Sequence, residues 1–162
     1  MATDLGLNIH AVRGRGYQMI SPTEWMDKAQ INAALGPVAR HYHLQLLDAT
    51  DSTNQVLMLA ADTGAPDGSV VCAEYQFAGR GRRGRQWHSA LGGSLTFSVL
   101  WRFEEGIAAL VGLSLAVGVA MARALNQYSQ FPVKLKWPND VLVDFRKLAG
   151  ILVEIQGDIQ GP

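Results

Sequence analysis

A short loop rich in arginine and glycine is the strongest chemical signal in the sequence. Residues 79–85 read Gly-Arg-Gly-Arg-Arg-Gly-Arg and lie between two expected strands. Core packing cannot explain this run, because charged side chains are rarely buried without partners. Glycines let the backbone close around a ligand, and guanidinium groups match phosphate and carboxylate oxygens in pairs. The loop therefore predicts a site for a phosphate-bearing small molecule, with an RNA-binding segment and a solvated loop as the alternatives.

Lysine and aspartate gather in a second segment. The sequence KWPND at residues 136–140 is followed by RKLAG at residues 146–150. A lysine can neutralise charge that develops on a transferring phosphoryl or acyl group. Asp140 could orient an amine nucleophile and help to take its proton. The alternative is a surface ion pair beside a turn, which contributes about 0–1 kcal/mol to stability.

A third polar segment precedes an expected helix. Residues 51–54 read Asp-Ser-Thr-Asn, and these residue types are favoured at helix N-caps. Their hydroxyl and amide groups could also bind the polar end of a ligand. The two interpretations are compatible, because capping uses only some of these groups.

The composition limits the classes of function. The chain has 14 lysines and arginines and 14 aspartates and glutamates, so its formal net charge is zero. A protein that binds nucleic acid through its overall charge would be more basic. The single cysteine, Cys72, is expected to be a packed core thiol. The uncharged run at 107–122 is shorter than the roughly 20 residues that span a bilayer. With no signal-peptide pattern in residues 1–16, we expect a cytoplasmic protein without a membrane partner.

The elements that must position these residues follow from the hydrophobic periodicity. Strong alternation at 95–103 predicts a strand in which Leu95, Phe97, Val99, Trp101 and Phe103 form the buried face. Strands outnumber helices and several are joined by short turns, so the fold class is α+β, with a mixed, mostly antiparallel sheet backed by helices. The other expected strands are at 44–47, 70–74, 133–137, 141–144 and 147–155, and the helices are at 21–34, 54–63 and 107–128.

The first residues differ from the rest. Residues 5–10 and 17–20 are expected to be two short strands, and the sequence Arg-Gly-Arg-Gly at 13–16 is a turn signal between them. A hairpin without a third strand is marginal in water. We therefore expect residues 1–21 to be the end of a separate domain.

Five motifs together carry a family resemblance. Residues 51–54, 74–76, 79–87, 136–140 and 146–150 occur in the order seen in biotin protein ligases, which the chain resembles over about residues 44–155. The segment 13–17 resembles the wing of the winged-helix domain in ligases that are also repressors. The resemblance implies the class II aminoacyl-tRNA synthetase/biotin ligase catalytic fold. It divides the chain into a wing remnant at 1–21 and an incomplete catalytic domain at 22–162, without later sheet strands and a C-terminal barrel.

The resemblance also assigns substrate-binding residues. The biotin ureido end would be lined by Ser52, Thr53, Asn54 and Gln76. Biotin and the phosphate of biotinyl-5′-AMP would be contacted by Arg80, Gly81, Arg82 and Lys147. The adenylate loop would be supported by Arg83, Arg85 and Trp87.

The implied reaction has two steps. ATP with Mg²⁺ activates biotin to biotinyl-5′-AMP, with Lys147 and Arg82 as the catalytic cations. Asp140 then orients the lysine of a biotin carboxyl carrier protein that receives the biotin. No protein metal site is assigned, and the resemblance leaves a homodimer of the full-length protein open.

Two other functions share this architecture. One is a biotin-responsive transcriptional repressor, although the recognition helix that would precede the wing is absent and DNA binding by this chain is not expected. The other is a lipoate or octanoate transferase, in which we would not expect the arginine-glycine loop beside residues 136–140. We expect little ligase activity from these 162 residues alone.

Overall fold

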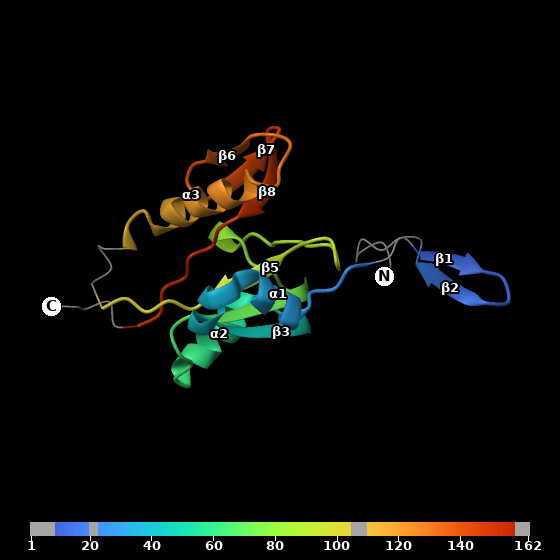
Figure 1. Ribbon diagram of the computed structural model, residues 1–162, viewed down its shortest axis with the longest axis horizontal. Coiled ribbons are helices and arrows are strands. Elements are labelled where there is room, and N and C mark those ends of the chain that lie inside the picture. Colours follow the sequence, from blue (N-terminus) through green and yellow to red (C-terminus); the bar gives the residue numbers. More distant parts are fainter. Residues whose placement is uncertain (1–8, 20–22, 105–109, 158–162) are drawn as a thin grey trace. The chain divides into compact units, whose positions relative to one another are not determined.

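The computed structural model describes residues 9–19, 23–104 and 110–157 (Figure 1). The chain forms two compact units. The first comprises residues 1–80 with 85–102, and the second comprises residues 81–84 with 103–162.

The N-terminal hairpin forms as the sequence predicts, within the described residues. Strands β1 (Ile9–Val12) and β2 (Gly16–Met19) are antiparallel, and the Arg15 amide donates to the Val12 carbonyl across the turn at 2.9 Å. Gly14 has φ of +75°, a conformation that glycine adopts without strain. The expected strand residues 5–8 and 20 lie outside the described residues. The winged-helix origin of this hairpin stays a prediction.

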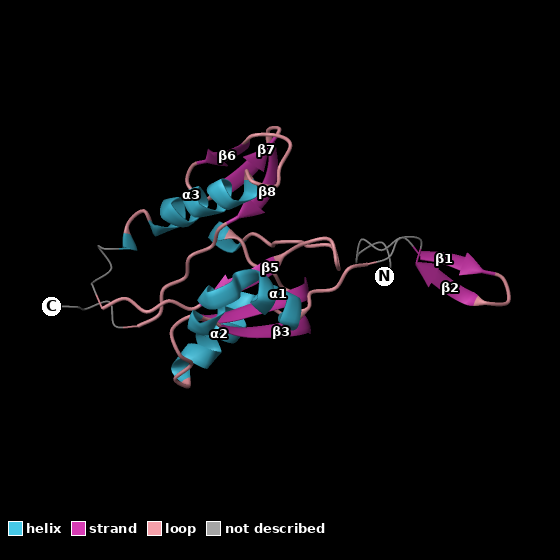
Figure 2. Ribbon diagram, in the orientation of Figure 1, coloured by secondary structure: helices cyan, strands magenta, loops and turns pink. Residues whose placement is uncertain are grey.

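A three-stranded sheet organises the rest of the first unit. Its order is β3-β4-β5, with β3 parallel to β4 and β5 antiparallel to β4. Helix α2 connects the two parallel strands and packs against β4 and β5, while α1 contacts β3 (Figure 1). Most of the segment between β4 and β5 is loop (Figure 2). The elements are α1 (Lys28–Leu35), the 3-10 helix η1 (Gly36–His41), β3 (His43–Thr50), α2 (Thr53–Asp62), β4 (Ser69–Gln76) and β5 (Thr96–Val99).

The second unit is one helix on an antiparallel sheet. Helix α3 lies along the sheet β6-β7-β8 and contacts β6 and β7 (Figure 1). Ala122 of α3 joins Val133, Val141 and Ile151 in a buried apolar cluster, and Val141 is fully buried. The elements are the 3-10 turn η2 (Arg82–Gly84), α3 (Leu113–Leu125), β6 (Val133–Lys136), β7 (Asp140–Val143) and β8 (Arg146–Gly150).

The fold class is confirmed: helices back sheets in which one strand pair is parallel and the other pairs are antiparallel. The hairpin expected around residues 145–146 turns at Asp144 and Phe145, both at positive φ. Among the described residues, no helix is long and apolar enough to cross a membrane.

The start of the first helix differs from the prediction. The expected N-cap residues 21–22 lie outside the described residues, and α1 begins at Lys28 with Asp27 as its cap. The Asp27 carboxylate accepts from the Gln30 amide at 2.7 Å. Upstream, the Met26 amide donates to the buried Glu74 carboxylate at 2.6 Å. This contact with β4 holds Met26 outside the helix, so a long-range hydrogen bond overrides the local helix signal.

The burial predicted for the strand at 95–103 is wrong. Strand β5 covers only Thr96–Val99, and the apolar side chains expected inside are between 37% (Val99) and 70% (Leu95) exposed. Helix α2 packs against β5 on the opposite face, where Ser98 contacts the α2 residue Thr53. Alternation therefore identified the two faces but not which of them the helix covers.

Two elements are shorter than expected. The expected helix at 107–128 is described only from residue 110, and α3 begins at Leu113 after Gly112, which has φ of +90°. Strand β8 ends at Gly150 rather than at Ile155. Just beyond it, the Ile151 amide donates to the Asn139 carbonyl at 2.9 Å and extends the pairing by one backbone hydrogen bond.

Candidate functional site

The first group of site residues lies where two parallel strands end. Thr50 of β3 pairs with Gln76 of β4, and beyond the strands the Ala78 amide donates to the Asp51 carbonyl at 2.9 Å. The turn that leads into α2 is thereby held beside the end of β4. Ligands in sheets with parallel strands bind at this carboxyl edge.

Gln76 is the residue that caps helix α2. Its side-chain carbonyl accepts the Thr53 amide at 2.8 Å, and both side chains are buried. Ser52 occupies the N-cap position, within the segment 51–54 that the sequence offers for it, but makes no side-chain cap hydrogen bond. The Gln76 carbonyl faces the helix, and its amide nitrogen therefore faces away from it.

Ser98 links two of the expected biotin-binding residues. Its hydroxyl lies 2.8 Å from the Thr53 hydroxyl and donates to the side-chain carbonyl of Asn54. Sequence reasoning missed Ser98. The available signal was its place on the polar face of the alternating strand.

The arginine-glycine loop is closed at its base. Arg80 and Gln86 form an antiparallel bridge, and the Trp87 amide donates to the Gly79 carbonyl at 2.8 Å. A Cβ at Gly79 would lie 2.5 Å from the Trp87 carbonyl oxygen, so only glycine fits this approach. Arg80 Nη2 donates to Gln55 Oε1 at 3.0 Å. Gln55 is, after Ser98, a second residue beside the site that sequence analysis missed.

The tip of the same loop belongs to the second unit. Arg82 Nη1 donates to the Asn139 side-chain oxygen at 3.3 Å. Asn139 is itself held, because its amide nitrogen donates to the Ile151 carbonyl at 2.8 Å. The motif at 136–140 was recognised in the sequence, but no role was predicted for Asn139.

Asp140 and Lys147 face each other across β7 and β8. Lys147 Nζ lies 2.7 Å from Asp140 Oδ1, and the two side chains are 43% and 24% exposed. The pairing register shifts between Val141 and Leu142, so that Val141 opposes Ala149 and Leu142 opposes Lys147. Bulges of this kind re-aim side chains near functional sites. Two of the three residues predicted to act in catalysis therefore form one charge pair.

The sequence of the larger part of the chain has known relatives. Residues 46–160 match the biotin/lipoate A/B protein ligase family. The chain belongs to this family. An Escherichia coli member named bifunctional ligase/repressor BirA is 44% identical over 156 residues, which make up 95% of this chain and 46% of that protein. A Mycobacterium tuberculosis member named biotin–[acetyl-CoA-carboxylase] ligase is 42% identical over 117 residues, or 69% of this chain and 44% of that protein.

Solved structures of biotin protein ligases share the fold. The Aquifex aeolicus ligase in complex with biotin and ATP is 37% identical, with a TM-score of 0.61 over 72% of this chain and 48% of that one. The Leishmania major ligase in complex with biotinyl-5-AMP is 28% identical, with a TM-score of 0.60 over 72% of this chain and 53% of that one. The chain spans about half the length of the curated relatives it matches.

The structure brings the predicted ligase residues together in two groups. Ser52, Thr53, Asn54 and Gln76 gather at the carboxyl edge of β3 and β4. Asp140 pairs with Lys147, and Arg82 contacts Asn139. Gly81, Arg83, Arg85 and Trp87 lie in or beside the loop, and their ligand contacts stay predictions.

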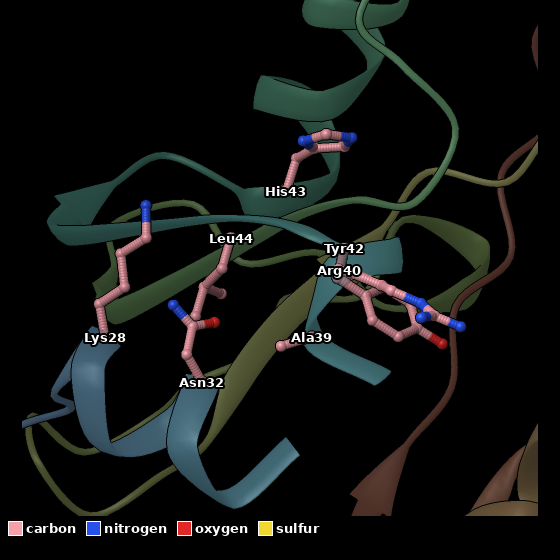
Figure 3. Close-up of a pocket in the computed structure, with 7 residues that line it drawn as sticks. All are labelled: Lys28, Asn32, Ala39, Arg40, Tyr42, His43 and Leu44. Atoms are coloured by element: carbon pink, nitrogen blue, oxygen red, sulfur yellow. The ribbon is translucent and has the colours of Figure 1, made fainter. Parts of the chain in front are cut away.

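The first unit also contains a hollow outside the predicted motifs. It has a volume of about 540 Å³ and lies between α1, η1 and β3. Figure 3 shows that its side chains diverge, with His43 and Leu44 pointing to opposite sides of β3. None of the predicted ligase residues lines it. Its lining residues are Lys28, Asn32, Ala39, Arg40, Tyr42, His43 and Leu44.

Cys72 is a packed thiol, as the sequence predicts. It is buried on β4, and its burial, followed by the charge of Glu74, raises the pKa of the thiol from 9.0 to about 11. A thiol with this pKa is protonated at neutral pH and is a poor nucleophile. Among the described residues, no group of three or more His, Cys, Asp or Glu could hold a metal ion.

Proposed function

We propose that this chain functions as part of a biotin protein ligase, which forms biotinyl-5′-AMP from biotin and ATP and transfers biotin to a lysine of a carrier protein. The observation that carries the proposal is the gathering of Thr53, Asn54 and Gln76 at one strand edge. These groups offer amide and hydroxyl contacts for a small polar head, such as the ureido ring of biotin. The ligases named above share this fold.

The first step joins two anions. The biotin carboxylate attacks the α-phosphorus of ATP, the new O–P bond forms, and pyrophosphate leaves. Cations must hold the two anions together and stabilise the charge that develops. Lys147 and Arg82 would supply this charge from the chain. Mg²⁺ would enter with the ATP phosphates, which commonly bind this ion together with one or two carboxylates.

The second step transfers the biotinyl group. The amine of the acceptor lysine attacks the biotinyl carbonyl, an amide forms, and AMP leaves. The amine must first lose a proton, so a carboxylate that accepts its hydrogen would assist. Asp140 would take this role. Its Oδ1 faces Lys147 at 2.7 Å, and a carboxylate has a second oxygen that can accept from an incoming amine.

The acceptor and location follow the same proposal. We expect the acceptor to be a biotin carboxyl carrier protein and the enzyme to work in the cytoplasm. The wing-like hairpin at residues 9–19 would belong to a DNA-binding domain, as the name ligase/repressor of the E. coli relative suggests. A homodimer of the full-length protein is left open.

A chimera tests the proposal. This chain would be followed by the part of the E. coli relative that lies beyond the matched segment, so that every residue discussed comes from this chain. Biotin-dependent exchange of pyrophosphate with ATP is expected, followed by biotin transfer to a carrier domain. Lipoate and octanoate serve as competing substrates. If lipoate or octanoate drives the exchange and biotin does not, the proposal is overturned in favour of a lipoyl or octanoyl enzyme.

A further inference from the structure

Asn139 joins the core of the second unit to the tip of the arginine-glycine loop. Its backbone carbonyl accepts the Ile151 amide at 2.9 Å, and its side-chain nitrogen donates to the Ile151 carbonyl at 2.8 Å. Ile151 packs in the buried apolar cluster, so this pair of hydrogen bonds anchors Asn139 to the core of the unit. A third contact leads outward, because Arg82 Nη1 donates to Asn139 Oδ1 at 3.3 Å.

Two one-way partners decide how the Asn139 carboxamide is turned. A backbone carbonyl only accepts hydrogen bonds, and a guanidinium only donates them. The Ile151 carbonyl therefore requires the nitrogen of Asn139, and Arg82 requires its oxygen. Turning the carboxamide end for end would break both contacts, so its oxygen stays directed at Arg82.

The group that holds Arg82 carries no charge. Asp140, the next residue, faces Lys147 with a carboxylate at 2.7 Å, and that pair is neutral as a whole. Asn139 offers Arg82 an amide oxygen, a contact that orients the guanidinium without cancelling its positive charge. Asn139 is half-buried and Arg82 is exposed. The arrangement therefore presents an oriented cation to an anion that arrives from solvent.

We propose that Asn139 is a positioning residue for the first step, which orients the Arg82 guanidinium for the α-phosphate of ATP without neutralising it. The inference rests on the proposed function, in which Arg82 is one of the two cations of biotin activation. Asn139 acts through Arg82 and does not itself need to touch a substrate. Two neighbouring residues of the segment 136–140 then have separate tasks, since Asn139 serves activation and Asp140 serves transfer.

A double-mutant cycle in the chimera tests whether Asn139 acts through Arg82. Arg82→Ala should slow biotin-dependent ATP–pyrophosphate exchange about 100-fold or more, because it removes the cation. Asn139→Ala should slow exchange about tenfold or more, because a misplaced cation loses much of its effect. When Arg82→Ala is already present, adding Asn139→Ala should slow exchange by no more than about a further twofold. Independent roles would instead multiply the two losses.

Thermal melts provide a readout in which the two substitutions should behave differently. Asn139→Ala removes the hydrogen bond to the Ile151 carbonyl whether or not Arg82→Ala is present. Its effect on the melting temperature should therefore be the same in both backgrounds, while its effect on exchange should nearly vanish in one of them. If Asn139→Ala folds poorly, the same cycle is run with Asn139→Ser.

Ser114→Ala is the matched control. Ser114 is also half-buried, and its hydroxyl donates to the Pro138 carbonyl at 3.2 Å, so the variant removes a different hydrogen bond to the same segment. Exchange in Ser114→Ala should stay within about twofold of wild type. In Asn139→Ala the KM for biotin should also stay within about twofold, because the contacts proposed for the ureido ring are unchanged.

The outcomes separate this inference from the proposed function. The positioning role alone is overturned if a folded Asn139→Ala exchanges within about twofold of wild type, if its loss multiplies with that of Arg82→Ala, or if Ser114→Ala loses as much. No biotin-dependent exchange in the wild-type chimera overturns the proposed function and this inference with it.

Discussion

Lys147→Ala removes the cation that faces Asp140, and its expected cost to folding is small. The two charged groups are 2.7 Å apart, but the side chains are 43% and 24% exposed. Ion pairs this accessible to water contribute about 0–1 kcal/mol, and surface substitutions usually change stability by about 0.5 kcal/mol or less. We therefore expect the free energy of unfolding to fall by about 1 kcal/mol at most.

The expected cost to biotin activation is larger. Loss of one group positioned at a centre of developing charge typically costs about 2.7–4 kcal/mol in the transition state, or about 100- to 1000-fold in rate. The difference between this value and the stability loss separates a catalytic cation from a structural ion pair. Lys134→Ala is the matched control, because Lys134 lies in the same sheet. Its Nζ lies over the Phe145 ring, 5.4 Å from the ring centroid.

The assay is biotin-dependent ATP–pyrophosphate exchange in the chimera, with a thermal melt of each variant. Lys147→Ala should lose exchange by about 100-fold or more and keep its melting temperature near that of wild type. Lys134→Ala should keep both. Exchange within a few-fold of wild type in Lys147→Ala, together with a sharply lower melting temperature, would refute the catalytic assignment.

Three further predictions concern other residues. Asp140→Asn should slow biotin transfer from pre-made biotinyl-5′-AMP more than it slows ATP–pyrophosphate exchange, and equal effects on both would argue against its role in transfer. Gly79→Ala should destabilise the protein by about 1–3 kcal/mol in urea melts, because its Cβ would lie 2.5 Å from the Trp87 carbonyl oxygen. The raised pKa of Cys72 stabilises the fold below pH 9.0, and this contribution is lost as pH rises towards about 11. As pH rises through this window, the melting temperature of wild type should therefore fall relative to that of Cys72→Ala. A constant difference between the two melting temperatures would contradict the reasoning.

Local sequence patterns predicted most of the elements and all of the motifs. The short-range signals at the N-terminal hairpin, at α2 and at β6 to β8 come from residues that are neighbours in the chain, so the sequence alone carries them. The arginine-glycine loop likewise needed no tertiary information, because its charge excludes burial whatever surrounds it. The order of five motifs was sufficient to identify the ligase family.

Contacts between distant residues were decided only by the tertiary structure. No local pattern says that the Met26 amide binds Glu74, that Gln76 caps α2 in place of Ser52, or that Ser98 reaches Asn54. Each depends on the register between strands, which places one residue opposite another without altering the periodicity of either. The prediction of which face of β5 is buried failed for the same reason. Alternation separates the two faces of a strand, but helix α2, which packs against β5, selects the face that is covered.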